Sequence, residues 1–273
     1  MSVLARQSGR DPSTDRPGAH MAPGLVSANG AAITIQAVSK EFSGSHLALR
    51  DVNLIVHEHD FLCLVGASGC GKSTLLNLIA GLDKPTEGVI DHGDRKVAFM
   101  FQESTLFPWL TLEQNVALAL KLRGVERAER GPRVQELLDL VRLGGRGKNR
   151  PHELSGGMRQ RGALARVLAQ DAEIVLMDEP FAALDAMTRD SMHDEIERIW
   201  QQLGLTVVFV THNVREAVRL SNRTILMETV PGRVKSEFAI DLPRPRHPDD
   251  PVAAEISGQL TDELKAEVAR HVR

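Results

Sequence analysis

The sequence predicts an α/β fold built on a parallel sheet, and three observations support this. Segments 173–180 (EIVLMDEP) and 205–212 (LTVVFVTH) have the length and apolar content of strands buried on both faces. A helical pattern at 185–204 separates them, and strand–helix–strand order is typical of parallel pairs covered on both sides. A glycine-rich turn at 66–73 connects a further apolar run, 60–65 (DFLCLV), to a helical segment.

The composition is that of an ordinary globular protein. The 273 residues are 42% hydrophobic and 25% charged, which allows a substantial core. A net charge of −3 and an aromatic content of 4%, without tyrosine, argue against nucleic acid as a partner. Cys63 and Cys70 lie in a strand-like run and in the glycine turn, which favours a reducing compartment over a disulfide framework. No apolar run approaches the roughly 18 residues of a membrane span, so we expect the protein to reach a membrane only through a partner.

The predicted elements follow in order after an N-terminal extension. Residues 1–30 are rich in Ser, Pro, Gly and Arg and lack an apolar signal segment, so we expect them to be disordered. Short strands rich in Ile, Val and Leu are predicted at 33–42 and 48–56, and 96–101 (KVAFMF) suits a buried strand. The helix after the glycine turn is expected to end at Gly81.

The middle of the chain is predicted to be helical. Leucines and valines recur three and four residues apart between residues 104 and 168, notably in 112–124 and 133–145. Beyond Pro243 we expect an extended linker and then a helix with an apolar stripe, made by Ile256, Leu260, Leu264, Val268 and Val272. The predicted organisation is an extension at 1–30, a domain at 31–240 whose helical subdomain spans about 104–168, and a linker with a helix at 241–273.

The turn at 66–73 matches the pattern GxxxxGK[ST] of a phosphate-binding loop. Glycines let backbone N–H groups approach phosphate oxygens without a Cβ in the way, Lys72 adds a positive charge, and the Ser73 hydroxyl can bind Mg²⁺. The alternative is a chance glycine turn, which the preceding strand and following helix disfavour. The predicted nucleotide-binding residues are Gly66, Ala67, Ser68, Gly69, Cys70, Gly71, Lys72, Ser73 and Thr74.

Polar residues follow three of the apolar strands. Asp178 ends one strand and is expected to hold the Mg²⁺ shell, and Glu179 is the candidate to orient and deprotonate a water, although two such acids could simply cap a helix. His212 follows the next strand, where it could contact the γ-phosphate. Gln102 follows KVAFMF and could reach Mg²⁺ or the water. Singly, neither Gln102 nor His212 is distinctive.

A second anion site is predicted at Ser155, Gly156 and Gly157, which precede a helical run. Because these residues follow the helical insertion, we expect them to lie away from the phosphate loop of their own chain. A head-to-tail dimer, in which each copy closes the other's nucleotide, would give them a ligand. The alternative is a glycine-rich helix start with no ligand.

Together these residues resemble the ATP-binding cassette family, the ATPases of ABC transporters, over about residues 32–240. The resemblance implies a RecA-like P-loop NTPase core with a parallel sheet, an N-terminal antiparallel β subdomain and an inserted α-helical subdomain. It identifies 66–73 as the Walker A loop, Asp178 and Glu179 as the Walker B pair, and 154–158 (LSGGM) as the signature. It further implies a Q-loop glutamine at Gln102, a D-loop with Asp185 at the dimer seam, a switch histidine at His212 and an adenine-stacking aromatic at Phe42.

The resemblance also suggests a subgroup. Met158 stands where the family more often has glutamine, and this feature together with 106–116 (LFPWLTLEQNV) is similar to cassettes of the nitrate, sulfonate and taurine importers. The apolar cluster Phe107–Leu110 is then a docking patch for a transmembrane permease subunit, unless it only pins the helical subdomain to the core.

The resemblance implies an ATPase at the cytoplasmic face of the inner membrane. It would work as a homodimer with ATP and Mg²⁺, dock permease subunits and serve a solute-binding protein indirectly. A soluble cassette ATPase of DNA repair or translation is the first alternative, although coiled-coil insertions, twin cassettes and a basic face are missing from the sequence. An exporter subunit or a non-transport membrane ATPase is the second, and Glu179 argues against a non-enzymatic binding module.

Overall fold

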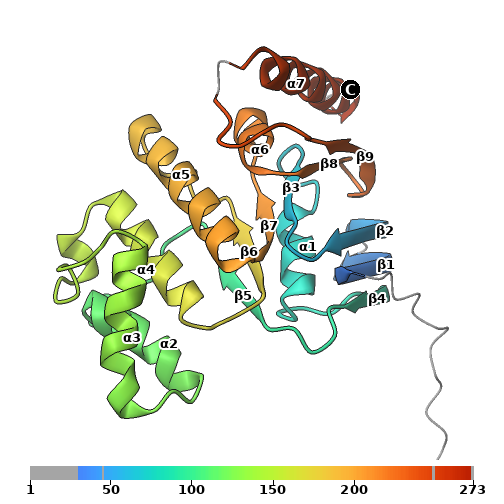
Figure 1. Ribbon diagram of the computed structural model, residues 1–273. Helices are drawn as coiled ribbons and strands as arrows, with labels where there is room; N and C mark the ends of the chain where they lie inside the picture. The colour runs from blue at the N-terminus through green and yellow to red at the C-terminus, as the bar shows by residue number, and fades with distance from the viewer. Residues whose placement is uncertain (1–29, 45, 248–249, 272–273) are drawn as a thin grey trace, which may run out of the picture.

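The computed structural model describes residues 30–44, 46–247 and 250–271, so nearly all of the predicted N-terminal extension lies outside the described residues. Its centre is a six-stranded sheet with the order β5-β6-β7-β3-β8-β9 (Figure 1). The strands are Val97–Met100, Ile174–Asp178, Thr206–Val210, Phe61–Val65, Arg223–Met227 and Val234–Ala239, in the order of the sheet. Strands β5, β6, β7, β3 and β8 are parallel, and only β9 runs antiparallel, to β8. The predicted parallel sheet is therefore confirmed.

A smaller antiparallel sheet lies beside it, with the order β2-β1-β4. It is formed by β1 (Ala31–Phe42), β2 (His46–His57) and β4 (Glu87–Asp91), and Ile35 of β1 pairs with Leu54 of β2 and with Ile90 of β4. This confirms the N-terminal antiparallel subdomain. Strand β4 is not among the predicted elements: it is short, partly exposed and contains a glycine, and its strand character depends on pairing with β1.

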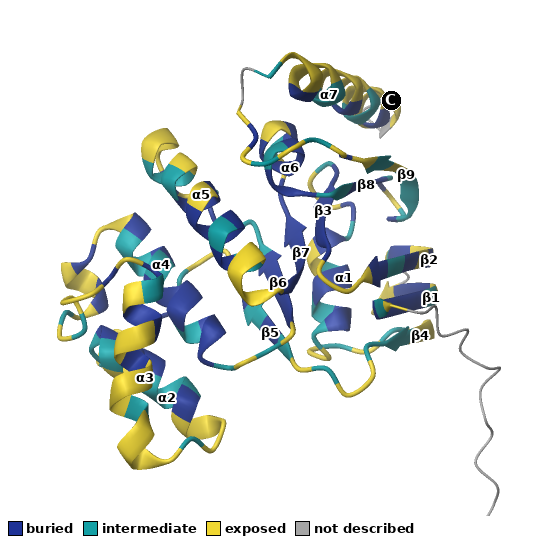
Figure 2. Ribbon diagram, in the orientation of Figure 1, coloured by how far each residue is buried: buried dark blue, intermediate teal, exposed yellow. Residues whose placement is uncertain are grey.

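The large sheet is buried on both faces, because alternate side chains of its strands enter two different cores (Figure 2). Leu62 and Leu64 pack with α1 (Lys72–Ile79) and the antiparallel sheet. Phe61 and Cys63 pack on the other side, against the remaining helices. These helices are α2 (Leu112–Leu122), α3 (Arg127–Leu140), α4 (Gly156–Leu168), α5 (Ala186–Leu203), α6 (Val214–Leu220) and α7 (Pro251–His271).

Helices α2, α3 and α4 pack on one another and form the predicted helical region. Thr111 begins α2 with a capping box, in which its hydroxyl accepts from the Gln114 N–H and the Gln114 side chain accepts from the Thr111 N–H. Gly162 of α4 lets Leu112 approach closely, since a Cβ there would lie 2.6 Å from a Leu112 methyl group. A short 3₁₀ turn, Pro151–Glu153, leads from this region into the signature segment.

The C-terminal helix α7 packs against α6. Along the predicted apolar stripe, Leu260 is fully buried and Ile256 and Leu264 are partly buried, whereas Val268 is exposed and Val272 lies outside the described residues. Residues 241–247 form no helix or strand, but side-chain contacts anchor them: Arg246 is buried and donates to the carbonyls of Leu242, Val218, Ser221 and Ile240. Within the described part of the chain, no helix is both long and apolar enough to cross a membrane.

Candidate functional site

The predicted phosphate loop connects the end of β3 to the start of α1. Gly71 is the N-cap of α1, with φ +90°, and no side chain caps this helix. A Cβ on Gly71 would lie 2.5 Å from a Leu49 methyl group, and one on Gly66 would lie 2.5 Å from Cys70 Sγ. Both positions therefore require glycine, and the first N–H groups of α1 have no side-chain acceptor. Such a helix start is suited to an anion.

Lys72 is buried, and its ammonium group lies within the loop. Its Nζ donates to the carbonyl oxygens of Gly66 at 2.8 Å and Ala67 at 3.0 Å. Cys70 Sγ lies 3.5 Å from the same nitrogen, yet burial raises the pKa of this thiol more than Lys72 lowers it. Cys70 is therefore a neutral packing residue here. The remaining loop residues offer surface to a ligand: Ser68, Gly69 and Ser73 are exposed and Thr74 is half-buried.

Asp178 ends β6 and meets α1 through a hydrogen bond with the Ser73 side chain. Burial is the main cause that raises the pKa of Asp178, the neighbouring Glu179 charge adds to it, and the Ser73 hydrogen bond opposes it. Glu179 has a φ of +45°, a left-handed conformation that side chains other than glycine rarely adopt. Its N–H donates to the Val210 carbonyl at 3.0 Å, which ties the turn after β6 to the end of β7. Strain of this kind is typical of functional sites.

His212 and Glu179 are brought together by the neighbouring strands β6 and β7. His212 Nδ1 lies 2.9 Å from Glu179 Oε2, and both side chains keep contact with solvent. A cavity of about 20 Å³ lies beside this pair, and Thr211 and Arg189 also line it. A volume of this size has room for about one water molecule.

The order of the strands places the predicted residues along one edge of the sheet. Gln102 lies exposed just past β5, followed across the sheet by Asp178 and Glu179 on β6, His212 on β7 and the phosphate loop on β3. Carboxyl ends of parallel strands meet at one edge, so this grouping follows from the topology.

Phe42 lies at the end of β1, on the small sheet. It is 42% exposed, and Lys40 Nζ lies 5.0 Å from the centre of its ring. Lys40 pairs with Leu49 of β2, which is the residue that Gly71 touches. The exposed aromatic ring therefore lies on the part of the small sheet that borders the phosphate loop.

The signature residues lie on the other side of the large sheet. Ser155 is the N-cap of α4, and its Oγ accepts from the Met158 N–H at 3.3 Å. Helix α4 packs in the core opposite to that of α1 (Figure 1). A Cβ on Gly157 would lie 2.4 Å from Thr188 Cγ2, and Asp185 caps α5 by accepting from the Thr188 N–H at 3.0 Å. The signature and the predicted D-loop are thus neighbours, and the phosphate loop of the same chain lies on a different face.

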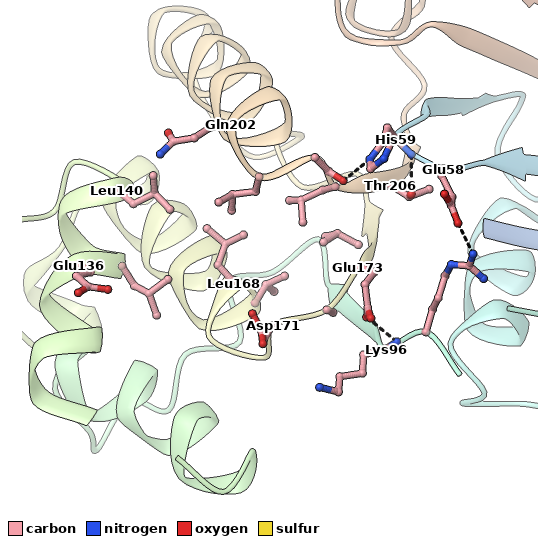
Figure 3. A pocket seen from close by; sticks show the side chains of 18 of the residues that line it. Glu58, His59, Lys96, Glu136, Leu140, Leu168, Asp171, Glu173, Gln202 and Thr206 are labelled. Atoms are coloured by element: carbon pink, nitrogen blue, oxygen red, sulfur yellow. Dashed lines mark hydrogen bonds and ion pairs between the residues drawn. The ribbon is translucent and has the colours of Figure 1, made fainter. Parts of the chain in front are cut away.

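A larger cavity, of about 590 Å³, lies at the opposite edge of the sheet (Figure 3). Glu173 and Thr206, at the amino ends of β6 and β7, line it. Its polar groups largely bind one another: Glu173 accepts from the Lys96 N–H at 2.9 Å, and His59 Nδ1 lies 2.6 Å from the Gly204 carbonyl. None of the predicted site residues lines this cavity, so its size does not mark the functional site.

Comparisons with known proteins agree with this arrangement. The family model described as ABC transporter matches residues 49–182. The aliphatic sulfonates import ATP-binding protein SsuB of Bacillus licheniformis is 46% identical over 224 residues, covering 80% of this chain and 87% of the relative. The nitrate import ATP-binding protein NrtD of Synechocystis is 45% identical over 207 residues, covering 73% of this chain and 78% of the relative. A solved dimeric post-hydrolysis state of the ATP-binding cassette MJ0796, bound to ADP and Pi, is similar with a TM-score of 0.67 and 34% identity, covering 77% of this chain and 99% of that one.

Proposed function

Because the chain belongs to the ABC transporter family and is an ATPase of that family, we propose that it powers solute import as a head-to-tail homodimer. The observation that carries this proposal is the placement of the two anion-binding turns. The phosphate loop opens α1 and the signature opens α4, and these helices pack on opposite faces of the sheet. A nucleotide can therefore contact both turns only if a second copy supplies one of them.

In this proposal the phosphate loop holds the ATP. The uncapped N–H groups of α1 and the Lys72 ammonium bind the β- and γ-phosphates, and Phe42 stacks on the adenine. Ser73 and Asp178 are joined by a hydrogen bond and offer oxygen ligands, the donor type that Mg²⁺ prefers, and Gln102 at the same edge adds an amide oxygen. Bound there, Mg²⁺ would neutralise charge on the phosphate oxygens.

Glu179 and His212 carry out the reaction with water. Glu179 orients the attacking water and accepts its proton, and the cavity beside it has the size of one water. The contact between His212 Nδ1 and Glu179 orients the imidazole and leaves Nε2 to face the γ-phosphate. Lys72 stabilises the charge that develops on the phosphate oxygens.

Ser155, Gly156 and Gly157 would contact the γ-phosphate of the partner's ATP, with Asp185 at the seam between the copies. ATP would draw the copies together because it makes these contacts only in the closed dimer, and hydrolysis would release them. Met158 takes no direct part in this proposal, since its side chain is partly buried against the core of its own chain.

The closing motion would be passed to permease subunits through the cluster Phe107–Leu110. Trp109 is 67% exposed, although its ring lies 5.4 Å from that of Phe107, which in turn lies against Arg166. Leu106 beside them is buried, so the segment is anchored in the core while Trp109 is exposed at the surface. An exposed tryptophan on a fixed base is suited to a protein partner.

The proposal further specifies that the imported solute is a small anion, and the functions for which the relatives are named support this. SsuB and NrtD are named for import of aliphatic sulfonates and nitrate, respectively. The ATPase would then lie at the cytoplasmic face of the membrane, with a solute-binding protein acting on the other side. Copurification with the permease, followed by ATPase assays with nitrate, taurine or an alkyl sulfonate, tests this part. Turnover that no anion stimulates would favour an exporter or another membrane complex.

The Glu179→Gln variant tests the catalytic proposal. We expect turnover to fall by about 100-fold or more, because the water loses its base, while ATP binding and the ATP-bound dimer persist. ATPase assays and size-exclusion chromatography with Mg-ATP measure both. Glu173→Gln, at the other end of the same strand, is the matched control and should retain wild-type turnover. Unchanged hydrolysis in Glu179→Gln would contradict the assignment.

A further inference from the structure

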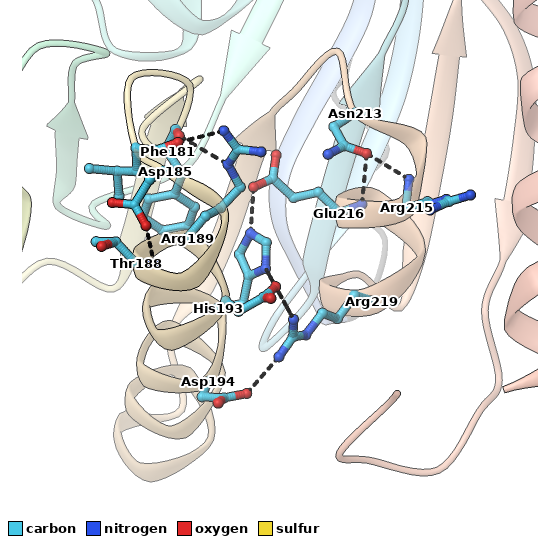
Figure 4. A network of polar contacts seen from close by, with 12 residues as sticks. Phe181, Asp185, Thr188, Arg189, His193, Asp194, Asn213, Arg215, Glu216 and Arg219 are labelled. Carbon is cyan, nitrogen blue, oxygen red and sulfur yellow. Dashed lines mark hydrogen bonds and ion pairs between the residues drawn. The ribbon is translucent and has the colours of Figure 1, made fainter. Parts of the chain in front are cut away.

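A buried polar bridge joins α5 to the start of α6, beneath the loop that carries His212 (Figure 4). His193 Nε2 lies 2.6 Å from Glu216 Oε1, and Glu216 Oε2 accepts from the Thr211 hydroxyl. The exposed fractions of His193, Glu216 and Thr211 are only 4%, 7% and 2%. Polar groups buried to this degree must satisfy one another.

The donors and acceptors of the bridge can be assigned from chemistry. Arg219 lies 3.4 Å from His193 Nδ1 and can only donate, so Nδ1 accepts and Nε2–H donates to Glu216. Glu216 thereby accepts at both of its oxygens. The Thr211 oxygen, which donates to Glu216, accepts from the Asn213 N–H at 3.0 Å. The bridge therefore ends on the two residues that flank His212.

The guanidinium of Arg219 is itself held in place. Its two nitrogens donate to Asp190 at 2.8 Å and to Asp194 at 2.7 Å, both on α5. The bridge thus connects α5 and α6 through a fixed chain of donors and acceptors rather than through a single contact. A chain of this kind has one arrangement in which every member is satisfied.

The same helix holds the loop that follows Glu179. Arg189 donates to the carbonyls of Phe181 at 3.3 Å and Leu184 at 2.7 Å. The Phe181 ring lies against the His193 ring, with centroids 5.5 Å apart and an angle of 63° between the planes. His193 therefore contacts both catalytic loops, one through Phe181 and the other through Glu216.

We infer that His193 and Glu216 are positioning residues for the ATPase reaction, which hold His212 in register with Glu179. The inference rests on the proposed roles of Glu179 and His212. Sequence patterns do not reveal this pair, because His193 and Glu216 are 23 residues apart in the chain and belong to none of the motifs. An apolar pair could fill the same space, but it would leave the Thr211 hydroxyl without its acceptor and would not fix the backbone around His212.

Two substitutions of His193 separate positioning from simple stability. His193→Leu removes the donor to Glu216, and we expect kcat to fall about 10-fold while the Kd of the monomer for ATP changes by less than about 2-fold. His193→Gln can donate to Glu216 and accept from Arg219, and it should retain more than about half of the wild-type kcat. Ile196→Val, in the core of the same helix, is the control for a destabilised α5 and should keep wild-type kcat. Equal losses in His193→Leu and His193→Gln would overturn the inference.

A double-mutant cycle with His212→Ala shows whether His193 acts through His212. If it does, adding His193→Leu to His212→Ala should lower kcat by less than about 2-fold, instead of the 10-fold loss expected in the wild-type background. If His193→Leu still lowers kcat by about 10-fold in the His212→Ala background, the inference about His193 is overturned, but the proposed role of His212 stands. Wild-type turnover in His212→Ala would instead overturn the proposed role of His212, and the inference with it.

Discussion

The starts of α1 and α4 are both rich in small residues, but they differ in whether a side chain accepts from their first backbone N–H groups. At α1 the N-cap is Gly71, and no side chain satisfies the first N–H groups. At α4 the N-cap is Ser155, whose hydroxyl accepts from the Met158 N–H. The first helix start thus leaves its backbone donors to a ligand, whereas the second already has one internal acceptor.

This difference supports the proposal that the phosphate loop binds ATP within one chain and that the signature turn needs a second copy. The phosphate loop has its charge, Lys72, and its neighbouring carboxylate, Asp178, within the same chain. The Ser155 hydroxyl accepts from the Met158 N–H of its own helix, and the next two residues, Gly156 and Gly157, lie against Leu184 of the D-loop and Thr188 of α5. The Arg159 guanidinium at this helix start already donates to the Leu154 carbonyl at 2.6 Å, and we expect the turn to bind a nucleotide only when a second copy brings it there.

Of the substitutions at the two helix starts, Lys72→Ala should have the largest effect, and the property it changes is ATP binding by the phosphate loop. Loss of the ammonium group removes a charge-assisted contact to phosphate, and we expect ATP binding by the isolated monomer to weaken about 100-fold. Titration of the purified monomer with a fluorescent ATP analogue measures the Kd. Binding within a few-fold of wild type would show that the backbone donors of α1 hold the nucleotide without Lys72.

Ser155→Arg should show most clearly that the start of α1 serves ATP binding by the monomer and the start of α4 serves turnover by the dimer. We expect monomer binding of ATP to stay within about 2-fold of wild type, because α4 lies on the other face of the sheet, whereas turnover falls more than about 10-fold because the closed dimer cannot form. Equilibrium titration and size-exclusion chromatography, the latter in the Glu179→Gln background, report the two properties. Loss of ATP binding by the monomer would contradict the proposed contact across the dimer.

Ser155→Ala isolates the capping role of the serine. The variant loses the bond to the Met158 N–H, which typically costs about 1 kcal/mol and corresponds to a Tm lower by about 2–4 °C in a protein of this size. Ser155→Thr retains the acceptor and serves as the control in thermal unfolding. A Tm equal to wild type in Ser155→Ala would mean that solvent satisfies this helix start.

Asp178→Asn should have the smallest effect on stability. Unlike Ser155→Ala, it should raise the Tm. The pKa of Asp178 is raised in the folded chain by burial and by Glu179, so the free energy of unfolding falls as the pH rises through the folded-state value. The variant cannot ionise, and we expect its Tm to exceed that of wild type by about 1–3 °C near pH 8. The gain should shrink as the pH falls through the folded-state pKa of Asp178, because the wild-type carboxyl then becomes protonated and neutral as well. A gain that does not depend on pH would contradict this account.

The fold could be predicted from the sequence wherever a local pattern decides it. Apolar strands such as 173–180 and the leucine spacing of 112–124 became strand β6 and helix α2. Strand β4 and helix α6 escaped prediction, because one is mostly exposed and the other is only seven residues long. Both depend on neighbours distant in sequence, β1 for the strand and α7 for the helix.

Chain order alone is enough to predict which residues gather at the edge of the sheet. Asp178, His212 and the phosphate loop each follow an apolar strand, and the carboxyl ends of parallel strands share one edge. Local order along the chain is sufficient for that conclusion, because strand direction fixes where each following residue lies.

How those residues are held depends on contacts that form only in the folded chain. The placement of α4 opposite α1 depends on which side chains of the sheet each helix covers, and the bridge from His193 to Glu216 joins residues on two separate helices. The positive φ of Glu179 is likewise fixed by packing and by its bond to Val210. These features arise from contacts between distant segments, and the periodicity of a single segment carries no information about them.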